Sequence, residues 1–199
     1  MIIKPNQIDA LDCFVDSDFA GNYTTFPDQD PTSAKSRTGY VILFQGCPIL
    51  WVSKMQTQCA LSTMESEYLA LSQAMRDLIP LREIMKEVNK EVFNKDIHIP
   101  KCSANSKSFS DIVSTEEESP IPKSKVYEDN AACLKFARLP RLTPRTKHIA
   151  VPYHWFRTKV EQLEISIEPI SSEKQLADQF TKPLTLDKFL KARYDLMGW

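Results

Sequence analysis

The first half of the chain combines short strand-like segments with one long helical segment. Apolar and β-branched residues dominate 11–17, 38–44 and 48–53, and the tripeptide QGC between the last two is typical of a hairpin. From about 62 to 91, apolar residues recur every three or four positions, which predicts an amphipathic helix. Pro80 lies within this helix and is expected to kink or split it.

The second half alternates between strand and helix patterns. Strands are predicted over 124–128 and 164–170. Helices are predicted over four ranges, namely 130–139, 152–163, 171–182 and 187–197. Ser and Glu open the third of these in a capping pattern. Strands joined by short turns pair antiparallel, whereas strands joined through helices favour parallel pairing. We therefore expect an α/β fold with a five-stranded mixed sheet, three strands antiparallel and then two parallel, and helices on both faces.

The segment from about 94 to 123 differs from the rest of the chain. It is rich in Ser, Lys and Glu and poor in aromatic residues, which predicts a flexible surface insertion. With 199 residues in all, 1–199 is expected to be a single domain around one sizeable core. No apolar run approaches the roughly 18 residues of a membrane span, and the N-terminus lacks the pattern of a signal peptide.

Charge and cysteine content narrow the chemistry. The net charge is -1 and the pI about 6.3, so any contact with nucleic acid has to be local or mediated by metal. The five cysteines are scattered and form no CxxC, which argues against zinc and favours a reducing compartment. The three histidines add no metal-ligand spacing.

Four acidic residues follow the predicted elements in an order that suggests a metal site. Asp16 ends a strand, Glu67 lies on the long helix, Asp129 follows a strand and Asp178 lies on a helix. Together they fit a carboxylate cage for a divalent cation, which favours phosphodiester hydrolysis. At about 100° per residue, Glu67 borders the apolar stripe of its helix, whereas Glu65 lies further from it.

Each of the four acids also has an ordinary interpretation. Asp16 could begin a turn, and Glu67 could pair with Arg76 or a tyrosine hydroxyl. Asp129 could be a helix N-cap, a role that Asn130 could equally fill.

Asp178 could lie on a solvated helix face and form ion pairs with Lys174 and Lys182, four residues to either side. Lower-ranked candidates for phosphate contact are basic residues that are ordinary surface charges in the alternative interpretation. They are Lys54, Arg145, Lys147, His148 and Lys182.

Six motifs occur in an order that resembles a known family. They are FVDSDFAG, SRTGYVILFQGCPILWVSKMQ, ALSTMESEYLALSQA, YEDNAACL, PRTKHIAVPYHWFR and QLADQFTKPL. The chain resembles the C-terminal ribonuclease H domain of copia-type retrotransposon Pol polyproteins from about residue 11 onward, apart from the insertion. The resemblance implies a ribonuclease H-like fold with Asp16, Glu67, Asp129 and Asp178 as catalytic, metal-binding carboxylates. It favours Asp16 over Asp18 because Ser17 follows it.

The resemblance also implies an activity. The expected enzyme is an endonuclease that hydrolyses the RNA strand of RNA–DNA hybrids during reverse transcription, using two Mg²⁺ ions about 4 Å apart, with Mn²⁺ as a substitute. Expected partners are the hybrid and the upstream reverse transcriptase domain. The expected location is the cytoplasm, within virus-like particles, with access to the nucleus. Expected substrate contacts are Ser17, Ser62, Thr63, Asn130, Lys147 and His148.

Two departures from the family pattern leave alternatives open. The loop 171–173 lacks the histidine that many ribonucleases H carry there, and no basic helical protrusion fits between Leu139 and His148. One alternative is therefore a catalytically weak or inactive module for nucleic-acid binding or Pol assembly. A glycosidase-like acid–base pair would need only two of the carboxylates.

Overall fold

A single mixed sheet organises the computed structural model, which describes residues 10–23, 34–93, 122–138, 155–162 and 164–199. Its five strands lie in the order β3-β2-β1-β4-β5. Their bounds are β1 (Leu11–Asp18), β2 (Arg37–Phe44), β3 (Cys47–Met55), β4 (Ser124–Glu128) and β5 (Ile165–Pro169). β1, β2 and β3 pair antiparallel, and β4 and β5 join in parallel. The predicted five-stranded mixed sheet is confirmed.

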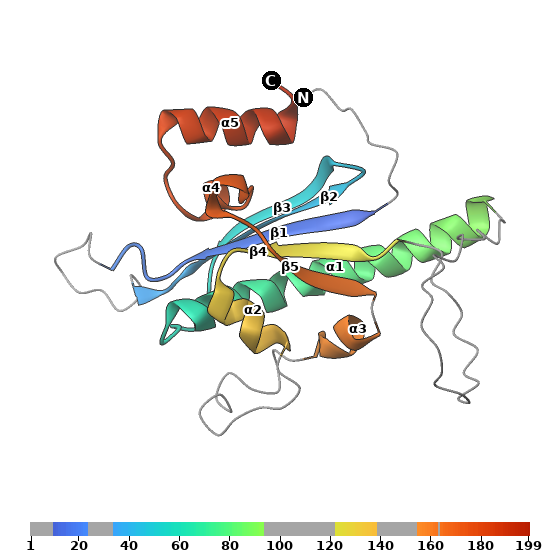
Figure 1. Ribbon diagram of the computed structural model, residues 1–199, viewed down its shortest axis with the longest axis horizontal. Helices are drawn as coiled ribbons and strands as arrows, with labels where there is room; N and C mark the ends of the chain where they lie inside the picture. The colour runs from blue at the N-terminus through green and yellow to red at the C-terminus, as the bar shows by residue number, and fades with distance from the viewer. Residues whose placement is uncertain (1–9, 24–33, 94–121, 139–154, 163) are drawn as a thin grey trace, which may run out of the picture.

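Helices cover both faces of this sheet (Figure 1). They are α1 (Thr63–Phe93), α2 (Ala131–Arg138), α3 (Arg157–Glu161), α4 (Asp178–Thr181), α5 (Leu186–Met197) and the short 3₁₀ helix η3 (Ser172–Lys174). α1, α2 and α3 lie on one face, and α4 and α5 lie on the other (Figure 1). No helix among the described residues is long and apolar enough to cross a membrane.

Helix α1 packs along the sheet through the apolar stripe that the sequence predicts. Tyr68, Leu71 and Leu78 of this stripe are fully buried. Pro80 does not split the helix, which runs without interruption to Phe93. Because Pro80 is on the exposed side, the carbonyl that loses its helical partner there can be hydrated, while the buried stripe holds the helix on both sides.

The opposite face of the sheet has a smaller core formed with α4 and α5. Val41, Leu43 and Leu196 are buried in it, and Phe14 and Phe180 pack against them. Helix α4 lies so close to β2 at Gly39 that a Cβ there would come within 2.6 Å of Thr181 Cγ2 and 2.9 Å of Phe180 Cβ. The absence of a side chain at Gly39 therefore sets the position of α4.

The predicted helix over 171–182 is wrong. The structure has η3, then an extended residue, Gln175, and then the four-residue α4. The Gln175 amide donates to the Val15 carbonyl of β1 at 2.8 Å, which fixes the chain in this bend. Ser171 makes no side-chain cap, so the predicted capping pattern is also absent. The bend places Asp178 against the end of β1.

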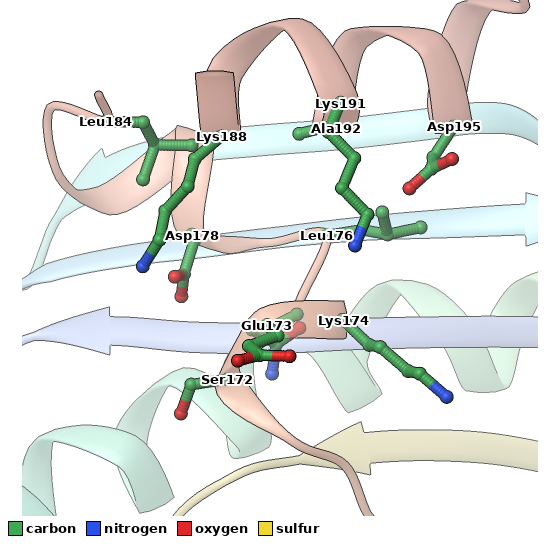
Figure 2. A pocket seen from close by; sticks show the side chains of 11 residues that line it. Ser172, Glu173, Lys174, Leu176, Asp178, Leu184, Lys188, Lys191, Ala192 and Asp195 are labelled. Carbon is green, nitrogen blue, oxygen red and sulfur yellow. The ribbon is translucent and has the colours of Figure 1, made fainter. Parts of the chain in front are cut away.

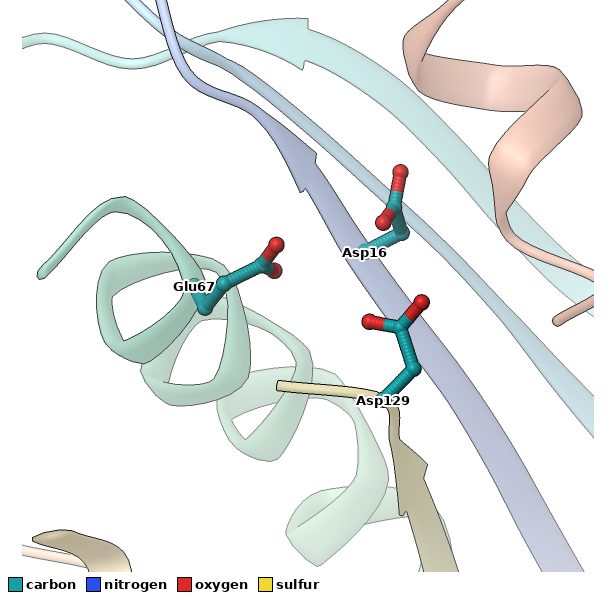
Figure 3. A group of neighbouring side chains, drawn as sticks. All are labelled: Asp16, Glu67 and Asp129. Atoms are coloured by element: carbon teal, nitrogen blue, oxygen red, sulfur yellow. The ribbon is translucent and has the colours of Figure 1, made fainter. Parts of the chain in front are cut away.

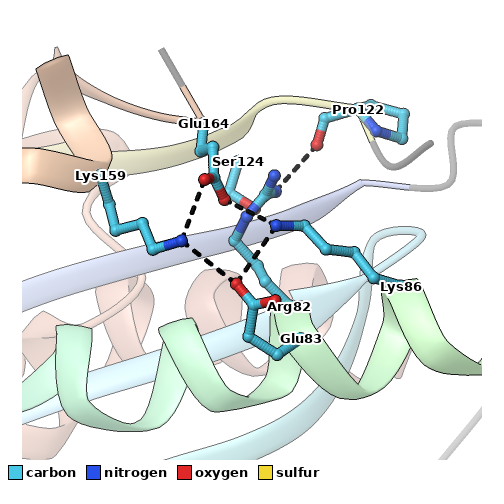
Figure 4. A network of polar contacts seen from close by, with 7 residues as sticks. All are labelled: Arg82, Glu83, Lys86, Pro122, Ser124, Lys159 and Glu164. Atoms are coloured by element: carbon cyan, nitrogen blue, oxygen red, sulfur yellow. Dashed lines mark hydrogen bonds and ion pairs between the residues drawn. The ribbon is translucent and has the colours of Figure 1, made fainter. Parts of the chain in front are cut away.

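Helix α3 is shorter than predicted, because it begins at Arg157 rather than Pro152 and ends at Glu161. Lys159 of α3 bonds to Glu83 of α1 and to Glu164 before β5, and Lys86 bonds to the same two carboxylates (Figure 4). This ring of alternating charges joins α1, α3 and the start of β5. Residues 152–154 lie outside the described part of the chain.

A buried arginine anchors the start of β4 to α1. Arg82 is 1% exposed, and its Nη1 donates to the Pro122 carbonyl at 2.9 Å and to Ser124 Oγ at 2.6 Å (Figure 4). The point at which the chain returns to the domain after the predicted insertion is therefore fixed. Residues 94–121 lie outside the described part of the chain, so the flexibility of the insertion stays a prediction.

Candidate metal centre

Three carboxylates from three different elements meet at one end of the sheet (Figure 3). Asp16 of β1, Glu67 of α1 and Asp129 after β4 each offer an oxygen atom, and these oxygens lie within 4.8 Å of one another. β1 and β4 are parallel neighbours, so their carboxyl ends reach the same edge of the sheet. The structure thus brings together three of the four acids singled out in the sequence.

Asp178 lies beside this group rather than within it. Lys182 Nζ is 3.0 Å from Asp178 Oδ1 and 3.6 Å from Asp16 Oδ2, so one ammonium group joins the two carboxylates. The Thr181 hydroxyl also donates to Asp16 Oδ2. Asp178 is buried, not on a solvated face, although its ion pair with Lys182 has the expected i, i+4 spacing. None of the described ion pairs joins it to Lys174.

Burial dominates the electrostatics of the group. Asp16 is 2% exposed and Glu67 7%. Burial raises the pKa of Glu67, and the charges of Glu128, Asp16 and Asp129 raise it further, against a smaller opposing effect of Lys182. Burial likewise raises the pKa of Asp16, while the Thr181 hydrogen bond and Lys182 lower it. A centre that holds these groups as carboxylates therefore needs additional positive charge.

Sequence reasoning missed one buried acid, Glu128, the last residue of β4. It is 0% exposed, and its Oε1 accepts the Asn130 N–H at 3.0 Å. Burial raises the pKa of Glu128 first of all, and the charges of Asp129 and Asp16 add to this. Period-two alternation could have found it, because Ser124, Val126 and Glu128 are all buried on one face of the strand.

The N-cap role considered for Asp129 belongs to its neighbour. Asn130 Oδ1 accepts the N–H groups of Ala132 at 2.9 Å and Cys133 at 3.0 Å, at the start of α2. Asp129 is free of that role, and its Oδ2 accepts a hydrogen bond from Ser172 Oγ at 2.7 Å. Asn130, a predicted substrate contact, thus uses its side-chain oxygen within the fold.

The other predicted substrate contacts are distributed around α1. Ser62 Oγ caps this helix by accepting the Glu65 N–H at 3.2 Å, and Thr63 is exposed in its first turn. Ser17 is buried, and its hydroxyl donates to Ser66 Oγ at 2.7 Å. Lys147 and His148 lie outside the described residues.

The donor set fits a divalent cation. Within the described part of the chain, Glu67 Oε2 and Glu128 Oε2 are buried with no hydrogen-bond partner, and Arg76, the alternative partner of Glu67, is exposed. A buried carboxylate left without a partner is costly, and carboxylate oxygens are the ligands that hard cations such as Mg²⁺ take. Asp16, Glu67, Asp129 and Asp178 are the residues that would hold it.

A shallow pocket opens beside Asp178, between η3 and α5 (Figure 2). Lys174, Lys188 and Lys191 line it together with Glu173 and Asp195. Its walls therefore carry both signs of charge, and the three lysines are exposed. None of these three lysines was among the phosphate-contact candidates of the sequence.

The sheet order and the two helical layers define a ribonuclease H-like fold. The structure is similar to the solved N-terminal RNase H domain of Rv2228c from Mycobacterium tuberculosis, with a TM-score of 0.50, 12% sequence identity, and coverage of 92% of this chain and 95% of that one. At this level of identity the likeness concerns the fold.

Relatives that match most of the chain are Pol polyproteins from plant transposons. The chain is 29% identical over 176 residues to the retrovirus-related Pol polyprotein from transposon TNT 1-94 of Nicotiana tabacum, which covers 88% of this chain. It is 24% identical over 185 residues, 93% of this chain, to that from transposon RE2 of Arabidopsis thaliana. The resemblance stated from the motifs is confirmed: the homologues are retrovirus-related Pol polyproteins and the fold neighbour is an RNase H domain. The chain spans 10% of the length of these relatives. No protein-family model matches it.

Proposed function

We propose that this domain is an endonuclease that hydrolyses the RNA strand of RNA–DNA hybrids during reverse transcription of a retrotransposon, by two-metal-ion catalysis with Mg²⁺. One observation carries the proposal: Asp16, Glu67 and Asp129 gather their oxygens within 4.8 Å at one edge of a ribonuclease H-like sheet. Phosphodiester hydrolysis at such carboxylates needs a divalent cation, since bare carboxylates would repel the phosphate.

The protein's own residues would fix the geometry of the site. Thr181 and Ser172 donate hydrogen bonds to Asp16 and Asp129, which orients the two carboxylates. Asp178 completes the set from α4. Bound Mg²⁺ would supply positive charge at the scissile phosphate and lower the pKa of the attacking water. Mn²⁺ is expected to replace it.

The substrate would be held through its backbone and its 2′-hydroxyl groups, as A-form duplexes are. Lys182 and the pocket residues Lys174 and Lys188 support phosphate contacts next to the carboxylates. Thr63 is accessible for a contact from the side of α1. Lys147 and His148 stay predicted contacts.

The partner proposed for the domain is an upstream reverse transcriptase domain of the same polyprotein, acting in the cytoplasm or in virus-like particles. The polyprotein nature of the relatives supports this. So do the exposed apolar side chains of Leu186, Phe189 and Tyr194 on α5, because a large exposed apolar surface is typical of an interaction site.

A catalytically inactive nucleic-acid or assembly module is the second candidate. The observation in its favour is that the Lys182 ammonium already lies between Asp16 and Asp178. In that case, adding Mg²⁺ would leave the NMR resonances of the carboxylates unchanged.

Cleavage of an end-labelled RNA–DNA hybrid, with Mg²⁺ or with EDTA, tests the proposal. Wild-type protein should cut only the RNA strand, and Asp129→Asn should reduce the rate at least about 100-fold. Asp187→Asn, a change of the same chemistry on α5, should leave the rate unchanged. Mg²⁺-dependent cleavage that persists in Asp129→Asn would show the assignment to be wrong. Adding the upstream polymerase domain should increase the rate.

A further inference from the structure

Glu128 is a buried acid with only part of its hydrogen-bonding capacity used. It is 0% exposed, and one oxygen accepts the Asn130 N–H at 3.0 Å. The other, Oε2, has no hydrogen-bond partner among the described residues, and none of the ion pairs found there includes Glu128. The neighbouring Cys133 thiol is a weak donor. Packing alone does not require an acid here, because an apolar residue of similar size would fill the space at lower cost.

The position of Glu128 connects it with the carboxylate cluster in two ways. Its hydrogen bond spans Asp129, because it joins the residue before Asp129 to the backbone of the residue after it. Among neighbouring charges, that of Glu128 also acts most strongly on the Glu67 carboxyl. Glu128 thus holds the turn that carries one predicted ligand, and its charge acts on the carboxyl group of another.

We propose that Glu128 is a positioning residue of the cation site and the fifth carboxylate that serves it. One oxygen fixes the turn that carries Asp129. The other is buried without a partner and adds negative charge next to Asp129, so that the site binds a divalent cation more tightly. This inference rests on the proposed metal-dependent function and adds to it a residue that lies outside the four assigned ligands.

Binding of Mn²⁺ alone to the full 199-residue chain, measured by electron paramagnetic resonance, tests this role. Glu128→Gln keeps a side-chain oxygen that can accept the Asn130 N–H and removes the carboxylate. It should weaken Mn²⁺ binding about 10- to 100-fold, the usual effect of losing a residue that supports metal ligands. Glu168→Gln is the matched control, because Glu168 lies opposite Tyr127 on the adjacent strand β5, and it should bind Mn²⁺ like wild type.

A measurement on the unaltered protein avoids any effect of the substitution on folding. The side-chain ¹³C carboxyl resonance of Glu128 should move as Mg²⁺ is added, together with those of Asp16 and Asp129, while that of Glu168 stays in place. Two results would overturn the role of Glu128 and leave the proposed function standing. One is Mn²⁺ binding to Glu128→Gln with an affinity within twofold of wild type, and the other is a Glu128 resonance that Mg²⁺ does not move. A wild-type chain that binds no Mn²⁺ would overturn the proposed function as well.

Discussion

The pH dependence of stability depends on single residues, above all on Glu67. Burial and the facing charges of Glu128, Asp16 and Asp129 raise its pKa, against Lys182. A raised pKa means that the folded state binds this proton more tightly than the unfolded state, whose value is about 4.5. The contribution is therefore fully present below pH 4.5 and is lost as the pH rises above it. Urea unfolding in EDTA should give a free energy of unfolding that falls from pH 5 to pH 8.

A substitution of Glu67 separates its contribution to the pH dependence of stability from the contributions of other titratable groups. Glu67→Gln should raise the free energy of unfolding in EDTA at pH 8 by about 1–3 kcal/mol, because it removes the cost of protonating an acid that is ionised in the unfolded state. It should also flatten the pH profile, whereas Glu161→Gln on the exposed part of α3 should do neither. Glu83 and Glu164, whose pKa values are lowered, act below pH 4.5 and so outside this range. A wild-type stability that rises from pH 5 to pH 8 in EDTA would contradict the prediction.

Lys182 is the cation that the described chain itself supplies to the site. Its ammonium joins Asp16 and Asp178, so Lys182→Met should destabilise the metal-free protein, by roughly 1 kcal/mol for a partly exposed pair. Saturating Mg²⁺ should reduce the difference in stability between Lys182→Met and wild type, because a bound cation neutralises both carboxylates in place of the ammonium group. Thermal unfolding with and without Mg²⁺ measures it, with Lys188→Met as the control. A difference that Mg²⁺ leaves unchanged would count against a cation beside Asp16.

At the residue scale, the sequence was sufficient to identify acids whose position can be judged from their own helix or strand. Glu67 could be chosen over Glu65 because helix geometry alone places it at the border of the buried stripe. Glu128 was not identified, because its neighbour Asp129 was already assigned as the acidic residue at the end of this strand. The effect of Glu128 on Glu67 also depends on a contact between segments that are distant in the chain. Lys182 was noted as a candidate, but its bridge between two carboxylates depends on the bend after η3.

At the scale of elements, the contact between α4 and β2 controls where Asp178 lies. A Cβ at Gly39 would come within 2.6 Å of Thr181 Cγ2 and 2.9 Å of Phe180 Cβ, so Gly39→Ala must displace α4. We expect a loss of about 1–3 kcal/mol in the free energy of unfolding and a larger relative loss of hybrid cleavage, because Asp178 and Thr181 move with the helix. Urea unfolding and cleavage rates check the two effects.

A second substitution tests whether the clash is the cause. Thr181→Ser removes the methyl group that the Cβ added by Gly39→Ala would meet, and it keeps the hydroxyl that donates to Asp16. Combined with Gly39→Ala, it should restore part of both stability and cleavage, since the contact with Phe180 persists. If Thr181→Ser makes the Gly39→Ala protein no better, α4 is not held in place by this contact.

Periodicity predicted the strands and the long helix well, and failed where a distant partner sets the conformation. Residues 171–182 carry a helical pattern, yet Gln175 is extended because its amide donates to the Val15 carbonyl of β1. That partner is far away in sequence, so a local pattern contains no sign of it. The failure coincides with the segment that positions Asp178.

At the scale of the whole molecule, strand order is what creates the candidate site. Asp16 and Asp129 meet because β4 lies next to β1, in the order β3-β2-β1-β4-β5. The antiparallel pairing of β1, β2 and β3 could be predicted from the sequence alone. Periodicity could not place β4 beside β1 rather than at the other edge, and the family resemblance supplied that step.

The long segment between α1 and β4 provides a test of the domain as one unit. Arg82 fixes Pro122 and Ser124 to α1, so the return of the chain into the sheet does not depend on residues 94–121. From Arg82 to Phe93 the helix rises roughly 16 Å at about 1.5 Å per residue. A Gly/Ser linker of about ten residues, which reaches roughly 30 Å when extended, is long enough to return along that distance.

Replacing residues 94–121 with this linker should preserve both the fold and hybrid cleavage. The free energy of unfolding should change by no more than about 1 kcal/mol, and in the stabilising direction, because a shorter loop costs less entropy to close. The same replacement combined with Arg82→Met should be clearly less stable, since Ser124 Oγ and the Pro122 carbonyl then lose their buried donor. Urea unfolding of the two variants beside wild type measures both effects. A marked loss of stability from the linker alone would show that residues 94–121 pack against the domain, contrary to the predicted flexible insertion.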